Sequence, residues 1–288
     1  MVNSVRGAAE RRVYSAEPTL RNPGVLMRDM ARDLRLSFAL GWQLAGRDLK
    51  AQYRQSLLGY LWALLPPLLI AASFVALKTS GVVSARAVSV PYGAYVVTGT
   101  LLWQIFADAV AAPLRLVIAS REMLIRVNFP REAIVLAGML TTLFGALVRL
   151  AVVIPLLLYY QLAPGAGLAF LPCGVLSLIL AGTCAGLLVT PIGVLYRDVE
   201  KVLPAALMLW MLLTPVAYPI SASAGEAGWL ALNFVAPLIE ASRNAIIGSG
   251  PIAWGAVAWV DGGVLLALLA GWLLLRLATP HLVARLGI

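Results

Sequence analysis

Ionisable side chains are scarce in this chain of 288 residues. Asp, Glu, Lys and Arg make up 12% of it, hydrophobic residues make up 61%, and the mean hydropathy is +0.89. A soluble domain carries about 25% charged residues, so the chain lacks the charge that a water-facing surface needs. One helix crosses the hydrocarbon with about 20 apolar residues, and the chain has material for several. The composition therefore predicts an all-α integral membrane protein.

Histidine occurs once, as His281. This scarcity excludes His-based catalysis and multi-His metal sites. The three lysines follow Leu49, Leu77 and Glu200, so none stands in the Gly-Lys-Ser/Thr context of a phosphate-binding loop. We therefore expect no catalytic residue, no metal and no cofactor on this chain. If ATP drives its activity, the ATP and its Mg²⁺ bind to another polypeptide.

Cysteine and membrane-embedded carboxylates are also rare. Cys173 and Cys184 lie eleven residues apart in one apolar segment, too far along one helix for a disulfide, and they are interpreted as small core residues. Asp108 stands alone in an apolar segment, and Asp261 lies at the edge of another. A proton-coupled carrier usually needs a relay of carboxylates or histidines inside the membrane, which this chain does not offer.

The chain divides into three regions. Residues 1–25 are polar and predict a disordered cytosolic tail. Residues 26–56 repeat apolar side chains at steps of three and four, which predicts an amphipathic helix. This helix lies either in the headgroup plane or on a soluble partner. Residues 57–288 form the transmembrane domain. Its six predicted membrane-spanning helices cover 57–77, 92–117, 133–160, 168–194, 202–218 and 260–277.

Two segments depart from plain spans. Pro66 and Pro67 predict a kink in the first span. Residues 219–259 are apolar but interrupted by glycine and proline, which predicts short or re-entrant external helices, covered by protein or water.

Basic residues predict the orientation. Eighteen Lys and Arg fall on the side that holds the N-terminus, against three on the other (Lys78, Arg86 and Arg243), while Arg149 sits inside a span. By the positive-inside rule, both termini are cytosolic. The net charge of +9 is explained by contact with the membrane surface and not by nucleic acid.

Polar and aromatic side chains within the spans are the candidate channel residues. Arg149 costs roughly 2.5–3.5 kcal/mol on insertion scales, so it contacts an anionic substrate, forms a buried pair, or extends toward the interface. Aromatic rings stack on sugars, but they also form interfacial belts. The belt interpretation is favoured for residues near span ends, and Trp103 and Phe106 lie deeper. The aromatic candidates are Trp103, Phe106, Tyr159, Tyr160, Trp210 and Tyr218.

The link between the second and third spans combines charged and apolar residues, REMLIRVNFPRE over 121–132. A short amphipathic helix ended by Pro130 fits this pattern. Such a helix fills a groove in a partner protein or rests on the bilayer surface.

Five stretches in order resemble the ABC-2 type permeases that export polysaccharides. They are 47–62 (RDLKAQYRQSLLGYLW), 90–92 (VPY), 124–132 (LIRVNFPRE), 196–219 (YRDV, LP and PVAYP) and 232–243 (LN and IEASR). The resemblance covers the chain from Arg47 to its C-terminus.

The resemblance implies a channel between two copies of this chain, with two separate ATP-binding subunits docked on the cytosolic side. The substrate would be a lipid-linked polysaccharide of the O-antigen, capsule or teichoic acid kind. The implied contacts with the ATPase are Met123, Leu124, Ile125, Arg126, Val127, Asn128, Phe129 and Pro130, followed by Arg197 and Asp198 in a second cytosolic loop over 196–201. The implied external gate includes Asn233, Glu240 and Arg243, the last two as a pair.

Three other functions remain open on the residues alone. They are an ABC-2 permease for a small molecule or drug, a membrane enzyme that acts on lipid-linked sugars, and a proton-driven carrier that needs no ATPase. The interrupted external segment and the aromatic candidates favour a glycan. The lack of a His or carboxylate cluster argues against the enzyme.

Overall fold

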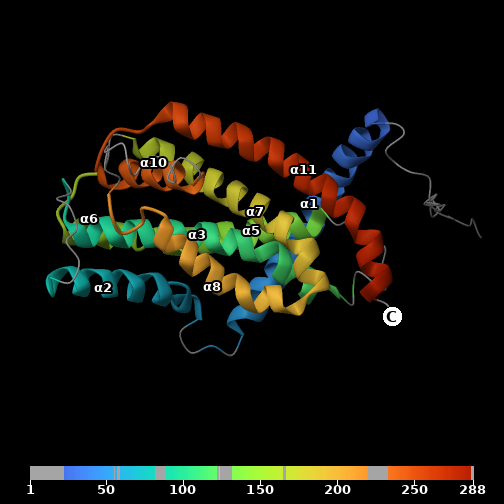
Figure 1. The fold of residues 1–288 in the computed structure, drawn as a ribbon, viewed down its shortest axis with the longest axis horizontal. Coiled ribbons are helices and arrows are strands. Elements are labelled where there is room, and N and C mark those ends of the chain that lie inside the picture. Colours follow the sequence, from blue (N-terminus) through green and yellow to red (C-terminus); the bar gives the residue numbers. More distant parts are fainter. Residues whose placement is uncertain are drawn as a thin grey trace, which may run out of the picture.

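The fold was analysed in a computed structural model, which describes residues 23–54, 56, 59–81, 89–121, 123, 132–164, 167–219 and 233–286. Within those ranges every regular element is an α-helix or a 3-10 helix (Figure 1). The elements are α1 (Pro23–Tyr53), η2 (Gly59–Ala63), α2 (Leu65–Thr79), α3 (Tyr92–Ala119), α5 (Glu132–Leu150), α6 (Val153–Tyr159), η3 (Leu168–Phe170), α7 (Leu171–Leu195), α8 (Arg197–Leu213), α10 (Val235–Ile247) and α11 (Trp254–Leu286).

Among the described residues, four helical segments are long and apolar enough to cross a membrane. They are Tyr92–Ala119, Glu132–Tyr159, Leu168–Leu195 and Trp254–Trp272. The prediction of an all-helical membrane protein is confirmed. The predicted count of six spans is not shown, because α2 and α8, which fall in the predicted first and fifth spans, have only 15 and 17 residues.

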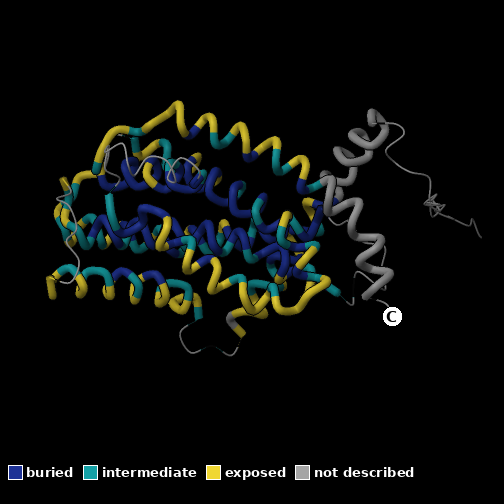
Figure 2. Tube along the Cα trace, viewed as in Figure 1, coloured by how far each residue is buried: buried dark blue, intermediate teal, exposed yellow. Residues whose placement is uncertain are grey.

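Helix α3 forms the centre of the bundle. It packs against α7, α5, α2, α10 and α8, and its buried residues occur on most of its circumference. Figure 2 shows the buried positions gathered on α3, α7 and α10, whereas α2, α8 and α11 are exposed along much of their length. Exposed leucines such as Leu69, Leu209 and Leu266 suit helices that face lipid, since the bilayer core is apolar.

Small residues bring α3 and α7 close together. A Cβ atom added to Gly182 would lie 2.5 Å from the Ala109 Cβ and 2.6 Å from the Phe106 carbonyl oxygen. A Cβ atom added to Gly186, one turn later, would lie as close to the Val110 carbonyl oxygen. Helices in membranes associate largely through such close backbone packing, so this glycine pair positions α3 against α7.

Prolines determine helix boundaries at two places differently from the prediction. Pro66 and Pro67 lie in the first turn of α2. Backbone N–H groups in a first turn have no acceptor within the helix, so the N–H that proline lacks is not missed there. The predicted kink is therefore wrong. Pro155 lacks the N–H that would bond to Ala151. The third predicted span accordingly breaks at Ala151 and Val152, and α6 begins at Val153.

The turn between α7 and α8 is shorter than predicted. Tyr196 alone separates the two helices, in an extended conformation with φ −123° and ψ 108°. The expected cytosolic loop over 196–201 is therefore wrong, because Arg197 and Asp198 already form the first turn of α8. Acidic residues in that turn favour the helix N-terminus, which explains the early start.

The remaining elements lie near their predicted places. Helix α1 begins at Pro23, inside the predicted tail, and packs along α5. The described part of the interrupted segment contains the short helix α10, ended by Gly248 in the left-handed conformation with φ 63°. Residues 220–232 of that segment lie outside the described residues. Helix α11 begins at Trp254, earlier than the predicted start at 260.

We expect Gly182→Ala to lower the unfolding midpoint of the purified chain. The new methyl group meets a backbone oxygen that cannot move freely, and overpacking of this kind costs about 1–3 kcal/mol. Thermal unfolding in detergent, followed by cysteine-reactive dye or light scattering, measures the shift. Gly263→Ala on α11 is the matched control, because its Cβ would meet no atom within 4 Å. Equal midpoints for the two variants would contradict the close packing of α3 on α7.

Candidate functional site

A charged pair joins α3 to α5 inside the bundle. The Arg149 guanidinium donates through Nη2 to Asp108 Oδ2 at 2.5 Å. Gln104, one turn before Asp108, donates through Nε2 to the other carboxylate oxygen at 3.0 Å. The Arg149 side chain is 5% exposed and that of Asp108 is 37% exposed. The sequence predicts that Asp108 stands alone, but in the structure it is paired with Arg149. Arg149 therefore forms the buried pair.

The pair offsets the cost of placing a cation at this depth. An isolated buried guanidinium would be strongly unfavourable, and a nearby carboxylate compensates for it. The compensation is incomplete, since Arg149 Nε and Nη1 are buried without a hydrogen-bond partner. A pair of this kind holds α5 in one rotation relative to α3, because only that rotation brings the two charges together.

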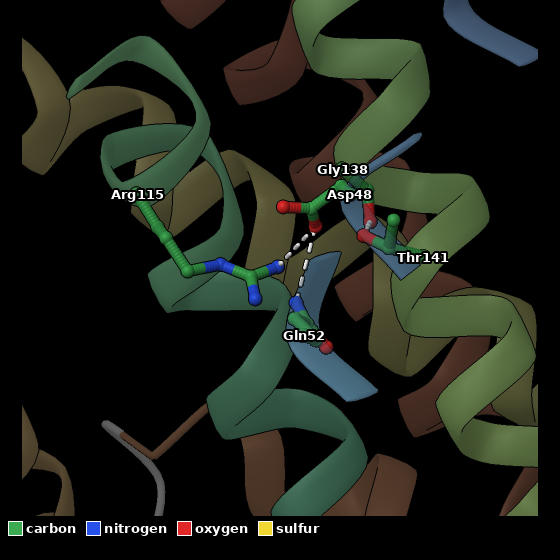
Figure 3. Close-up of polar contacts among 5 residues, drawn as sticks. All are labelled: Asp48, Gln52, Arg115, Gly138 and Thr141. Atoms are coloured by element: carbon green, nitrogen blue, oxygen red, sulfur yellow. Dashed lines mark hydrogen bonds and ion pairs between the residues drawn. The ribbon is translucent and has the colours of Figure 1, made fainter. Parts of the chain in front are cut away.

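A second pair joins α3 to α1. Arg115 Nη2 lies 3.3 Å from Asp48 Oδ2, and Gln52 donates to the same oxygen at 3.1 Å. Figure 3 shows these side chains converging from α1 and α3, with Thr141 of α5 beside them. Arg115 follows Asp108 by seven residues, so both project from one face of α3. This face therefore carries one charged contact to α5 and one to α1.

A cavity of about 450 Å³ lies beside this polar face of α3. Its lining comes from three helices, with Trp103, Gln104, Asp108 and Arg115 on α3, Ile70 on α2, and Glu200 to Met211 along α8. A second cavity of about 260 Å³ lies on the side of α1 and α5, and it shares Asp108, Ala111 and Arg115 with the first. The polar face of α3 is thus the common wall of two cavities.

An aromatic cluster packs behind the first cavity. Trp210 of α8 contacts Trp103 with ring centroids 6.1 Å apart, Phe106 at 5.2 Å and Phe234 at 5.6 Å. Phe106 is completely buried, so in the single chain it is a core residue. Trp103 is also buried but contributes to the cavity wall. The structure brings these predicted channel residues together.

The other aromatic candidates lie apart from this cluster. Tyr159 is 80% exposed at the end of α6, where its ring packs on that of Tyr160. Its exposure suits the interfacial belt. Tyr218 donates to the Leu212 carbonyl at 3.2 Å. It also lines a cavity of about 130 Å³ with Phe74 and Val216.

Arg243 has different partners from the predicted one. This almost fully buried side chain donates through Nη2 to the carbonyls of Pro215 at 3.1 Å and Val216 at 2.9 Å. Its Cζ lies 3.9 Å from the centroid of the Tyr95 ring. Glu240 is exposed and forms no ion pair with Arg243 in the described part of the chain. The expected pair is replaced because the buried carbonyls of the non-helical residues that follow α8 need hydrogen-bond donors.

Asn233 performs a related task before α10. Its Nδ2 donates to the Thr214 hydroxyl at 2.8 Å, and its Oδ1 accepts from the Val235 backbone N–H at 3.2 Å. Asn233 and Arg243 together attach α10 to the C-terminal end of α8. This attachment makes both residues structural within the single chain, and their role in an external gate stays a prediction.

The predicted contacts with an ATPase are only partly described. Leu124 to Pro130 lie outside the described residues. Met123 packs against a small core that includes Leu44, Ala45 and Ala133, and its sulfur lies 4.0 Å from Arg47 Nη1. The start of the linking segment is therefore attached to α1 and α5. Arg197 and Asp198 are exposed at the first turn of α8, where a partner can reach them.

Sequence reasoning missed Asp48, Gln52, Gln104 and Arg115 as site residues. From the sequence, Arg115 counts only among the basic residues that predict the orientation, and the other three do not stand out. The spacing of four between Gln104 and Asp108, and of seven between Asp108 and Arg115, was the available signal, because it places three polar side chains on one helical face. The two partners on α1 and α5 could not be inferred from spacing.

Removing one charge of the Asp108–Arg149 pair should destabilise the chain more than removing both charges. We expect Arg149→Leu to lower stability by about 3 kcal/mol, at the low end for a buried pair because Asp108 is partly exposed. Arg149→Leu with Asp108→Asn should recover part of the loss. Thermal unfolding of the four members of this double-mutant cycle tests the coupling. Additive effects would contradict the pair.

The hydrogen bonds of Arg243 to the Pro215 and Val216 carbonyls can be tested by substitution. Arg243→Lys should lower the unfolding midpoint, with about 2 kcal/mol lost per charged hydrogen bond, because one ammonium cannot contact two carbonyls and the Tyr95 face together. Glu240→Gln is the matched control and should unfold like the unmodified chain. A large fall in the unfolding midpoint for Glu240→Gln, with none for Arg243→Lys, would contradict these contacts and support the predicted pair of Glu240 with Arg243.

Comparison with known proteins agrees with this architecture. Residues 40–247 match the model of the ABC-2 type transporter family. The O-antigen export system permease protein RfbA of Myxococcus xanthus is 30% identical over 193 residues, covering 66% of this chain and 73% of that protein. The protein of the same name from Klebsiella pneumoniae is 25% identical over 204 residues, covering 70% and 77%. The chain therefore belongs to the ABC-2 type transporter family, as a multi-pass membrane permease subunit that works with ATPase subunits and is not itself the ATPase.

Proposed function

We propose that this chain is the permease of an ATP-driven exporter that moves a lipid-linked, O-antigen-like polysaccharide across the bacterial inner membrane. The relatives named as O-antigen export permeases support the substrate class. The observation that carries the proposal is the cavity beside α3, where partly exposed Asp108 lies next to apolar walls from α8. A carboxylate is costly in lipid, so this face needs water or a polar substrate.

Six spans with both termini in the cytosol fit the observed helices. A helix rises about 1.5 Å per residue, so α2 with its 15 residues reaches about 22 Å and α8 with 17 residues about 25 Å. The hydrocarbon is about 30 Å thick, and η2 extends α2 on one side. Both helices carry exposed leucines, which supports their assignment as the first and fifth spans. The distribution of Lys and Arg supports the orientation.

Two copies of the chain would close the pathway. The polar face of α3 and the cavity lie between α2 and α8, and both helices are exposed on their outer sides. A second copy placed against them would separate the Asp108 region from lipid. Homo-oligomers with twofold symmetry are the commonest arrangement in proteins. Two ATP-binding subunits would then dock at the cytosolic end.

The proposed docking element begins at Met123. Residues 123–130 would seat in a groove of the ATPase, with Arg197 and Asp198 as a second contact. The attachment of Met123 to the α1 core supports a path by which movement of the ATPase reaches α1. Helix α1 then connects to α3 through the Asp48–Arg115 pair.

Co-purification with candidate ATPase subunits from the same organism tests the proposal. We expect a complex that hydrolyses ATP, and we expect Met123→Asp and Leu124→Asp each to release the ATPase, because a carboxylate cannot be buried unpaired in an apolar groove. Leu168→Asp is the matched control, since it adds the same charge to an exposed residue of η3 at the predicted opposite end.

Three outcomes would separate the alternatives. Transport that persists with no ATPase in the complex would contradict an ATP-driven exporter and favour an autonomous carrier. A complex whose ATP hydrolysis responds to a hydrophobic drug but not to a lipid-linked glycan would favour the small-molecule permease. Release of the ATPase by Leu168→Asp as well would contradict the proposed docking segment.

A further inference from the structure

Two carboxylates, those of Asp108 and Glu200, line the larger cavity. Asp108 accepts one bond at each carboxylate oxygen, from Gln104 and from Arg149. A carboxylate has about four lone-pair sites, so the partly exposed side chain retains acceptor capacity. Glu200 adds a second carboxylate from the first turn of α8, and it is exposed. Donors from a ligand would therefore find partners here.

Positive charge at the cavity is already paired. Arg149 is buried and donates to Asp108 from behind the cavity wall. Arg115 reaches the cavity but pairs with Asp48 of α1. Glu200 has no ion-pair partner among the described residues. Asp108 is likewise paired with Arg149, so Glu200 carries the one charge in the lining that has no ion-pair partner among the described residues, and the balance is −1.

The rest of the lining is apolar. Trp103, Leu207, Met208 and Met211 are among the apolar side chains that line it, beside the two carboxylates. Mostly apolar walls with a few placed polar groups are typical of ligand sites, and the cavity volume is within the usual range of about 300–1,000 Å³. A sugar ring matches this lining, because its C–H faces are apolar and its hydroxyls donate hydrogen bonds at the edge.

We infer that this cavity selects uncharged, hydroxyl-rich sugar units over anionic ones, with Asp108 as the residue that determines this specificity. A carboxylate or phosphate on the sugar would approach Asp108 and Glu200 with like charge, which is unfavourable at short distance. Hydroxyl groups instead donate to the free lone pairs. The inference rests on the proposed function and concerns the sugar chain, not its lipid anchor.

Saturation-transfer NMR on the chain in nanodiscs tests this preference, since it detects weak binding and needs no ATPase. The probes are maltoheptaose, which is uncharged, and the galacturonic acid heptamer, which has the same length and one carboxylate per ring. We expect the neutral probe to give about fivefold more transfer, corresponding to about 1 kcal/mol. Asp108→Asn and Glu200→Gln should each reduce this ratio, mainly by raising transfer to the acidic probe.

Controls separate specificity from folding. Asp261→Asn removes another carboxylate, which accepts a bond from Ser177 at 2.9 Å and does not line the cavity, so it should keep the original ratio. Asp108→Asn leaves Arg149 unpaired, so the double variant with Arg149→Gln removes both charges together. Glu200→Gln affects only an exposed side chain and keeps the test decisive if both Asp108 variants misfold.

Several results would overturn the inference. They are equal transfer to both probes, stronger transfer to the acidic probe, no transfer to either, or an unchanged ratio in both Asp108→Asn and Glu200→Gln. Each of these leaves the ATPase complex intact and so contradicts only the sugar preference. Loss of the proposed function would appear separately, as failure to co-purify with any ATPase.

Discussion

The ion pair between Asp108 and Arg149 constrains much of this bundle. A guanidinium inside a span costs roughly 2.5–3.5 kcal/mol on insertion scales, and the carboxylate 2.5 Å away offsets that cost. To bring the two charges together, α5 must present Arg149 to the polar face of α3. Helix α1 then packs along α5 and reaches the same face through Asp48 and Arg115. The charged contacts thus determine the mutual rotation of three helices.

Helix α3 has two faces with different tasks. Ala109 and Val110 meet the glycines of α7, where only small residues allow the backbones to approach. Asp108, Ala111 and Arg115 line both cavities on the other side. Groups on a helix that is held on nearly all sides keep a defined position, as a specific binding surface requires. The same packing explains why the polar face can be charged, since Arg115 on it pairs with Asp48 of α1 and Asp108 on it pairs with Arg149 of α5.

The places where sequence reasoning failed share one physical cause. Proline prevents a helix from continuing backward but suits its first turn, so Pro66 and Pro67 could equally have marked a kink or a start. The break before α6 depends on Pro155, whose effect was not distinguished from an uninterrupted span. Tyr196 allowed α8 to begin five residues early, in a turn that local composition did not separate from a loop. Local patterns establish that a helix exists, and its ends depend on which backbone groups find partners.

Composition and order of residues alone determined that this is a helical membrane protein of the ABC-2 type, because scarcity of charge and a series of short family motifs are properties of the chain and not of its folding. They also singled out Arg149 as an unusual cation and Trp103 as a deep aromatic residue. Only the tertiary structure decided what these residues contact. Asp108 and Arg149 are 41 residues apart along the chain, and Asp48 and Arg115 come from different helices. No periodicity within one helix encodes such contacts, since they depend on how separate helices rotate and pack against one another.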